Sequence, residues 1–132
     1  KEDLGENKSG AFFGGPINQL SFRLASLDDL RIMYNRLAAE NGEAKLMAGT
    51  HGIAWSVYAH DPEGNTLEFF VDSPWFIDQP FLEPVDLSKS DADLMADTEN
   101  MIKDKPGFQE YGAWRNALAR KMGKRVVPKP FD

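Results

Sequence analysis

Alternating apolar and polar residues mark the first strand of the chain, and a helical pattern follows it. Residues 16–24 alternate, with apolar side chains at positions 20, 22 and 24 on one face, which predicts a half-buried strand. The capping-box-like sequence that begins at Ser26 precedes apolar residues at helical spacing, and the Asn41-Gly42 pair is typical of a helix end. We therefore predict a strand followed by a helix that starts at Ser26 and ends at Asn41-Gly42.

Three more strands are predicted in the next part of the chain. The short stretch 44–48 is a candidate strand, and the aromatic run 53–60 is another. Residues 61–64, Asp-Pro-Glu-Gly, have Pro and Gly where turns favour them, so the alternating run 65–72 is expected to return as a further strand. The predicted order of elements is therefore β-α-β-β-β.

After Pro74 the pattern changes again. A connector with several prolines leads to two amphipathic helical patterns, one opened by Ser90 and one after Pro106-Gly107. The last residues, 126–132, are expected to form an extended tail. The predicted fold class is α+β: a βαβββ module followed by a two-helix C-terminal extension. The expected division is a lead-in over 1–15, the module over 16–76, and the connector, helices and tail over 77–132.

Composition narrows the class of protein. Hydrophobic residues make up 42% of the 132 residues, enough for a core, and the lack of cysteine excludes disulfides and thiolate chemistry. The formal net charge of −6 argues against nucleic-acid binding, because phosphate contacts need an excess of Lys and Arg. No apolar run approaches the ~18 residues of a membrane span, so we expect a cytoplasmic protein without a membrane partner.

Two polar residues in the middle of predicted strands are candidate site residues. Gln19 and Glu68 both lie opposite the apolar positions of their strands, on the face that points away from the predicted helix. A carboxylate among apolar neighbours is costly to bury unless it is hydrogen-bonded, paired or bound to a metal. The alternative is that this face of the sheet is open to water, which the neighbouring Phe70 argues against.

The run from His51 to Trp75, which contains D-P-E-G-N-T-L-E, resembles the closing half of a module of the vicinal oxygen chelate superfamily. That superfamily holds glyoxalases, bleomycin-resistance proteins and type I extradiol ring-cleaving dioxygenases. The preceding N-Q-L-S-F-R-L-A-S-L-D-D-L is similar to the first strand and helix of the module, so the resemblance covers roughly residues 15–75. The helices of 78–122 resemble the C-terminal extension of dioxygenase-like members.

The resemblance implies roles for four residues. Glu68 stands at the position of the carboxylate metal ligand, and Gln19 stands where ring-cleaving members have a His ligand. Tyr58, ten residues before Glu68, corresponds to a tyrosine that hydrogen-bonds substrate, and His51 to an acid/base histidine. Read without the resemblance, His51 is a surface or capping residue and Tyr58 a cross-strand aromatic.

The metal expected from the resemblance is a divalent ion, with Fe(II) first and Mn, Zn or Ni as alternatives. Gln19 in place of His departs from the two-His, one-carboxylate pattern of ferrous oxygenases, whereas some glyoxalases use Gln there. The expected function is a dioxygenase-like oxidoreductase acting on a small aromatic diol. A glyoxalase-like lyase or isomerase with a Lewis-acid metal, and a metal-free ligand-binding protein of the bleomycin-resistance type, remain alternatives.

The resemblance also implies that one chain is not a whole site. In the superfamily two βαβββ modules form a U-shaped sheet and share the metal ligands, whereas this sequence has one such pattern, so its module is expected to be half of that sheet. We expect the second module either from a missing N-terminal half, which the Lys1 start suggests, or from a homodimer mate.

Overall fold

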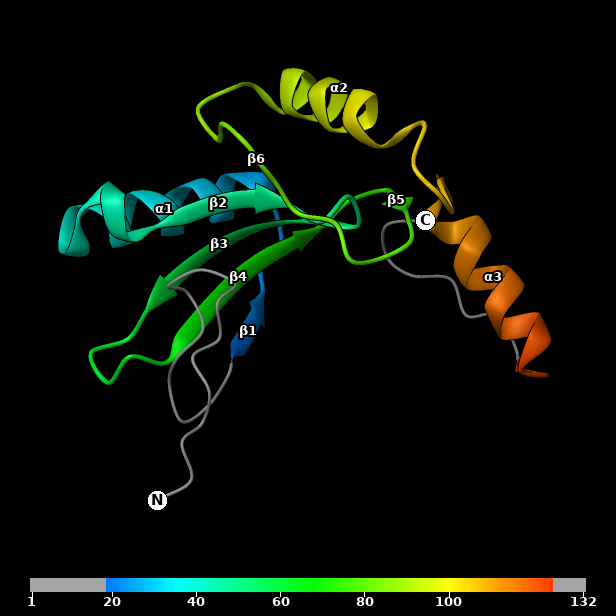
Figure 1. The fold of residues 1–132 in the computed structure, drawn as a ribbon, viewed down its shortest axis with the longest axis horizontal. Coiled ribbons are helices and arrows are strands. Elements are labelled where there is room, and N and C mark those ends of the chain that lie inside the picture. Colours follow the sequence, from blue (N-terminus) through cyan, green and yellow to red (C-terminus); the bar gives the residue numbers. More distant parts are fainter. Residues whose placement is uncertain (1–18, 125–132) are drawn as a thin grey trace. The chain divides into compact units, whose positions relative to one another are not determined.

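The computed structural model describes residues 19–124 of the chain and has an α+β fold. In this part of the chain there are three α-helices, a five-stranded sheet with the order β1-β4-β3-β2-β6, and a two-stranded sheet of β5 and β7 (Figure 1). The predicted lead-in at 1–15 and the tail at 126–132 lie outside the described residues.

The chain divides into two compact units. Of the described residues, the first unit comprises 19–48 and 56–71, and the second comprises 49–55 and 72–124. Each is described by itself below. The division expected from the sequence, with a boundary near residue 76, stays a prediction.

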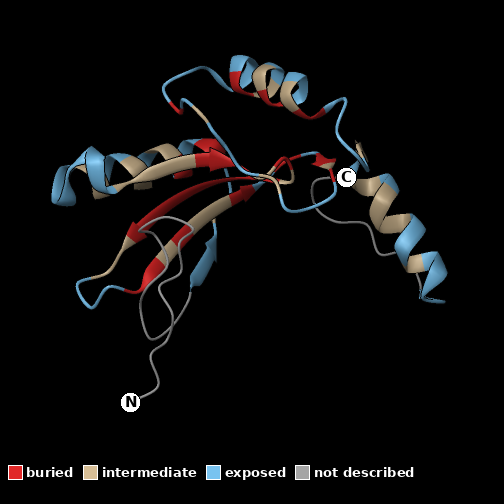
Figure 2. Ribbon diagram, in the orientation of Figure 1, coloured by how far each residue is buried: buried red, intermediate tan, exposed pale blue. Residues whose placement is uncertain are grey.

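The first unit contains β1 (Leu20–Arg23), α1 (Leu27–Asn41), most of β3 (Ala54–His60) and most of β4 (Thr66–Asp72). Strands β1 and β4 are parallel neighbours, with Ser21 opposite Glu68. Because β3 lies on the other side of β4 in the sheet order, β4 has a neighbour on each side. Figure 2 shows that β3 is the most continuously buried strand, whereas β1 is exposed.

Local chemistry sets the ends of α1. The Ser26 hydroxyl accepts a hydrogen bond from the Asp29 N–H at 3.1 Å, as expected for an N-cap. At the other end Gly42, whose φ is 84°, donates its N–H to the carbonyl of Ala38, a conformation that glycine adopts without strain. The predicted start and end of this helix are confirmed.

The turn between β3 and β4 is also as predicted. The Asp61 carboxylate accepts hydrogen bonds from the backbone N–H groups of Glu63 and Asn65, at 2.9 and 2.8 Å, and from the Asn65 side chain at 2.9 Å. Gly64 takes the positive φ of 84° that the turn requires.

Two predictions about strands are wrong. The strand expected at 44–48 is β2, Met47–Thr50, because Glu43–Lys45 forms a 3-10 turn. In it the Lys45 N–H donates to the Gly42 carbonyl at 3.2 Å, and the Leu46 N–H donates to the Glu43 carbonyl at 2.9 Å. The first strand was expected to be half-buried, but every residue of β1 is exposed, with Phe22 at 48%. The physical reason is that, among the described residues, β1 is an edge strand that has a paired strand on one side only.

The second unit is built around α2 (Asp91–Ile102), whose inner face is Leu94, Thr98 and Ile102. Ser90 caps this helix through a 3.2 Å hydrogen bond from the Asp93 N–H, as predicted. The Trp55 indole N–H donates to the Thr98 hydroxyl at 2.9 Å, and both side chains are buried.

Three two-residue strands complete the second unit. Strand β6 (Glu83–Pro84) pairs with the end of β2, and β5 (Trp75–Phe76) pairs with β7 (Gln109–Glu110), both antiparallel. Helix α3 (Tyr111–Lys121) follows β7 directly. Within the described residues, no helix is long and apolar enough to span a membrane.

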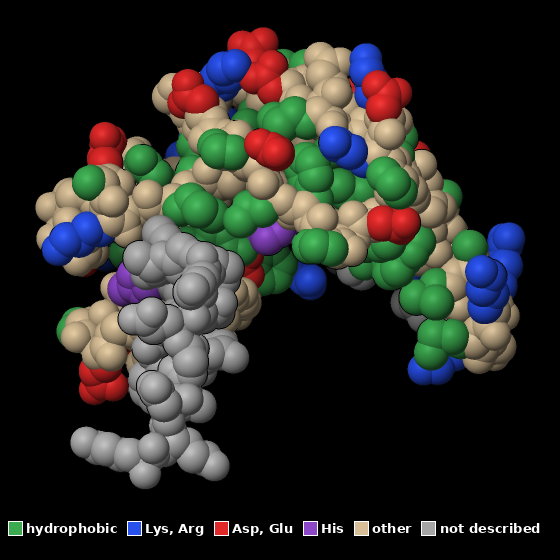
Figure 3. All heavy atoms as spheres, in the orientation of Figure 1, with side chains coloured by type: hydrophobic (Ala, Val, Ile, Leu, Met, Phe, Trp, Pro, Cys, Tyr) green, Lys and Arg blue, Asp and Glu red, His purple; other side chains and the backbone are tan. Residues whose placement is uncertain are grey.

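Helix α3 makes an aromatic contact with β5. The ring of Trp114 stacks on Phe76 with centroids 4.3 Å apart and an interplanar angle of 7°. Towards its C-terminus the apolar side chains of Leu118 and Met122 are exposed. Figure 3 shows Lys and Arg side chains gathered over this end of the helix.

Candidate functional site

A cluster of four polar side chains lies on one face of the sheet in the first unit. The parallel register of β1 and β4 sets Ser21 directly beside Glu68, and Gln19 precedes β1 by one residue and lies on the same side, since side chains two apart share a face. Tyr58 reaches the same carboxylate from β3. We call Gln19, Ser21, Tyr58 and Glu68 the Glu68 cluster.

Both oxygens of the Glu68 carboxylate accept hydrogen bonds. The Tyr58 hydroxyl donates to Oε2 at 2.6 Å, and the Ser21 hydroxyl donates to Oε1 at 2.9 Å. The Gln19 amide nitrogen donates to Oε1 at 3.0 Å and to the Ser21 hydroxyl oxygen at 2.8 Å. Short bonds to an ionised acceptor are among the stronger hydrogen bonds in proteins.

These contacts explain how the carboxylate is tolerated where it lies. Glu68 is only 8% exposed, so its carboxylate is not at a water-covered position, although Gln19 and Ser21 beside it are exposed. An unpaired buried carboxylate would cost several kcal/mol or more, whereas here three donors surround it. The requirement inferred from the sequence, that Glu68 needs a partner, is met by hydrogen bonds within the chain.

The environment of Tyr58 favours its neutral form. Burial raises the pKa of the phenol well above its usual range, and the hydrogen bond to Glu68 and the negative charge of that carboxylate raise it further. The nearby Ser56 hydroxyl opposes this rise in part. At neutral pH Tyr58 is therefore a hydrogen-bond donor, held by a carboxylate.

His51 belongs to the second unit, between β2 and β3. Its Nδ1 lies 2.8 Å from the carbonyl oxygen of Phe81. Because a carbonyl only accepts, Nδ1 carries the hydrogen, and in the neutral imidazole the lone pair is on Nε2. The Gln79 amide donates to the His51 carbonyl at 2.8 Å, so segment 79–81 holds both the backbone and the ring of His51.

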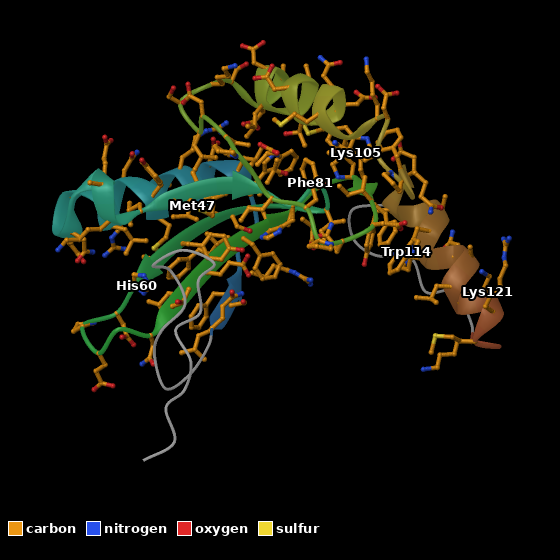
Figure 4. The ribbon with its side chains drawn as sticks, viewed as in Figure 1. Met47, His60, Phe81, Lys105, Trp114 and Lys121 are labelled. Atoms are coloured by element: carbon orange, nitrogen blue, oxygen red, sulfur yellow. The ribbon has the colours of Figure 1, made fainter. Side chains whose placement is uncertain are left out.

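Segment 79–81 is itself anchored within the second unit. The Lys105 ammonium lies 5.9 Å from the centre of the Phe81 ring, a cation–π contact that can be followed in Figure 4.

The four site residues predicted from the sequence are divided unevenly between the two units. Gln19, Tyr58 and Glu68 are brought together in the first unit, whereas His51 and Phe81, which its ring contacts, both belong to the second unit.

The Glu68 cluster fits part of a divalent metal site. Glu68 and the amide of Gln19 are neighbouring oxygen-bearing side chains, and oxygen donors suit hard divalent ions. Two ligands are fewer than the three or more protein ligands that transition-metal sites normally have. Among the residues that the structure describes, no group of three or more His, Cys, Asp or Glu is placed to hold an ion, so a metal at this cluster would need further ligands.

Sequence reasoning missed Ser21 as a member of the cluster. The signal was present, because strand alternation places Ser21 on the same face as Gln19, and it lies opposite Glu68 once β1 and β4 are paired. What the sequence did not provide was the register of that pairing. A serine at a solvent-facing strand position does not by itself indicate a functional residue.

Comparison of the chain with protein-family models, with curated proteins and with solved structures found no match.

Proposed function

We propose that this chain supplies half of a metal-dependent, ring-cleaving dioxygenase-like site of the vicinal oxygen chelate type, which acts on a small aromatic diol and is incomplete in a single chain. The observation that carries the proposal is the convergence of Gln19 and Tyr58 on the Glu68 carboxylate. These are the three residues of the first unit to which the resemblance gives roles at one site.

Glu68 and Gln19 would hold the ion, with Fe(II) as the first choice and Mn, Zn or Ni as alternatives. A divalent ion at this place would chelate two neighbouring oxygens of a diol and make dioxygen chemistry available beside the ring. The remaining ligands would come from a second βαβββ module, either in a longer chain or in a homodimer mate. A cytoplasmic location is part of the same proposal.

Tyr58 would orient the substrate. Its neutral phenol already donates to Glu68, and the oxygen of that phenol retains lone pairs that accept a hydrogen bond from a substrate hydroxyl. His51 would move protons through Nε2, the nitrogen that its Nδ1–H contact with Phe81 leaves as the basic one.

Catechol turnover tests the proposal. The protein with its second module, in a longer chain or as the homodimer, is loaded with Fe(II) without oxygen and mixed with catechol and oxygen. The reaction is followed by oxygen uptake and by the absorbance of the ring-opened product. Activity is expected to fall by at least about 100-fold in Glu68→Gln, since removing a ligand carboxylate removes the ion. Glu63→Gln, at an exposed carboxylate in the turn after β3, is the matched control. Undiminished turnover in Glu68→Gln would exclude the ligand role.

A metal-free ligand-binding protein is the second candidate. The observation that favours it is that both oxygens of Glu68 are already engaged by donors from the chain. In that case catechol would bind stoichiometrically in the presence of a chelator and would not be consumed. The glyoxalase-like alternative, favoured by Gln19, would show turnover with Ni or Zn and without oxygen uptake.

A further inference from the structure

The orientation of the Gln19 amide is set by its partners. Its nitrogen lies 2.8 Å from the Ser21 oxygen and 3.0 Å from Glu68 Oε1, so its two N–H groups have one acceptor each. With the amide reversed, the Gln19 oxygen would face a carboxylate oxygen that carries no hydrogen. The hydrogen bonds therefore favour one of the two orientations, with the nitrogen towards Glu68.

The spacing of these atoms also matches that of two metal ligands. In an octahedral site with metal–oxygen bonds of about 2.1 Å, adjacent ligand atoms lie about 3.0 Å apart, whereas bonds of about 2.3–2.6 Å, as for Ca2+, separate them by about 3.3–3.7 Å. The Gln19 nitrogen is 3.0 Å from Glu68 Oε1. A half-turn of the amide about its last side-chain bond would put an oxygen at nearly the same place.

We propose that the Gln19 amide inverts when a small divalent cation binds to Glu68, so that its oxygen replaces its nitrogen beside the carboxylate, and that Ser21 holds the amide in the metal-free orientation. The inference rests on the proposed function, because it requires that Glu68 binds a divalent ion. It adds a residue, Ser21, and a preference for small octahedral ions over Ca2+.

Ser21 favours the metal-free state because its hydroxyl has one hydrogen. In the metal-free arrangement the hydroxyl accepts from Gln19 and donates to Glu68, which makes two hydrogen bonds. With the amide inverted, the hydroxyl has two acceptors beside it and can donate to only one of them. Removal of Ser21 is therefore expected to strengthen cation binding. If Ser21 merely supported the ligands, its removal would weaken cation binding.

Nuclear magnetic resonance of the full chain, labelled with nitrogen-15, tests the inversion without any activity measurement. The side-chain amide signals of Gln19 are assigned with Gln19→Ala, and those of Gln79 and Gln109 serve as internal references. Addition of Mg2+ is expected to move the Gln19 signals to the positions of a solvent-exposed amide and to leave the two references unchanged. Ca2+ at the same concentration is expected to move the Gln19 signals less.

Free Mn2+, measured by electron paramagnetic resonance, gives the affinity of each variant. Ser21→Ala is expected to bind Mn2+ roughly 2- to 10-fold more tightly than the unchanged chain, which corresponds to one net hydrogen bond. Ser21→Thr, which keeps the hydroxyl, is expected to restore the original affinity, and Glu68→Gln to abolish binding. Because Ser21 is exposed, its replacement leaves the fold in place.

The outcomes separate the inference from the proposed function. If Mn2+ binding requires Glu68 but the Gln19 amide signals do not move when Mg2+ is added, the inversion is overturned and the proposed metal site is retained. If Ser21→Ala binds Mn2+ more weakly than the unchanged chain, Ser21 does not hold the Gln19 amide in its metal-free orientation. Absence of any Glu68-dependent Mn2+ binding overturns the inversion, and with it the form of the proposed function in which a homodimer mate supplies the second module.

Discussion

At the scale of single residues, the carboxylate of Glu68 organises the polar face of the first unit. Strand alternation alone placed Gln19 and Glu68 on one face, because side chains two apart on a strand point the same way. The directions of the hydrogen bonds, and the membership of Ser21, depend on the register of two strands more than forty residues apart in sequence. Local patterns carry no information about such a register.

Tyr58 gives the first prediction, which concerns pH in the metal-free chain. Its pKa is raised in the folded protein, so its stabilising contribution is fully present below the ordinary tyrosine value of about 10 and is lost as the pH rises through the raised value. At pH 7 Tyr58→Phe is expected to lower the free energy of unfolding by about 1.5–3 kcal/mol, as for a hydrogen bond to a charged group. Above about pH 10 the difference in the free energy of unfolding between Tyr58→Phe and the unchanged chain should shrink.

Urea unfolding at a series of pH values measures this difference, and the ultraviolet absorbance of tyrosinate reports ionisation directly. Tyr34→Phe, in α1, is the matched control. A difference between Tyr58→Phe and the unchanged chain that stays constant up to strongly alkaline pH would contradict the assignment of the raised pKa to Tyr58.

At the scale of elements, the boundaries that were predicted correctly are those with a local chemical cause. Ser26 and Ser90 cap their helices with their own hydroxyls, and the turn after β3 is held by Asp61. The short strands β5 and β7 were missed because each is two residues long and its partner lies more than thirty residues away. Their pairing is a consequence of tertiary structure.

The contact between β3 and α2 in the second unit gives the second prediction. Trp55 and Thr98 are buried, and the indole N–H has the Thr98 hydroxyl as its acceptor. Thr98→Val keeps the volume of the side chain and removes the acceptor, so it is expected to lower the free energy of unfolding by about 1–3 kcal/mol. Thermal or urea unfolding measures the change.

The conservative variant separates the hydrogen bond from packing. Thr98→Ser keeps the hydroxyl and loses one methyl group, which is expected to cost roughly 1 kcal/mol. If Thr98→Val proved as stable as the unchanged chain while Thr98→Ser did not, packing of the methyl group and not the hydrogen bond would be what Thr98 contributes.

At the scale of the whole molecule, the α+β class followed from the order of periodic patterns along the sequence, and the structure confirms it. The expectation that β1 would be half-buried failed because burial depends on what covers a strand, and within residues 19–124 β1 is an edge strand with a neighbouring strand on one side only. Completion of the sheet and the site by a second module likewise depends on what else is present beside this one, and no local sequence pattern encodes it.

The last prediction concerns that assembly. If Gln19 and Glu68 bind a divalent ion as proposed, each chain would supply two ligands, and two copies together would supply four, enough for one ion. If a homodimer mate supplies the second module, a divalent ion binds the dimer in preference to the monomer and shifts the equilibrium towards the dimer by mass action. Sedimentation of the chain with and without Mn2+ is expected to show a metal-dependent rise in the dimer fraction, with one ion bound per two chains. Glu68→Gln should abolish that dependence, and binding of one Mn2+ by each monomer would contradict it, because a monomer that completes its own site has no need of a mate.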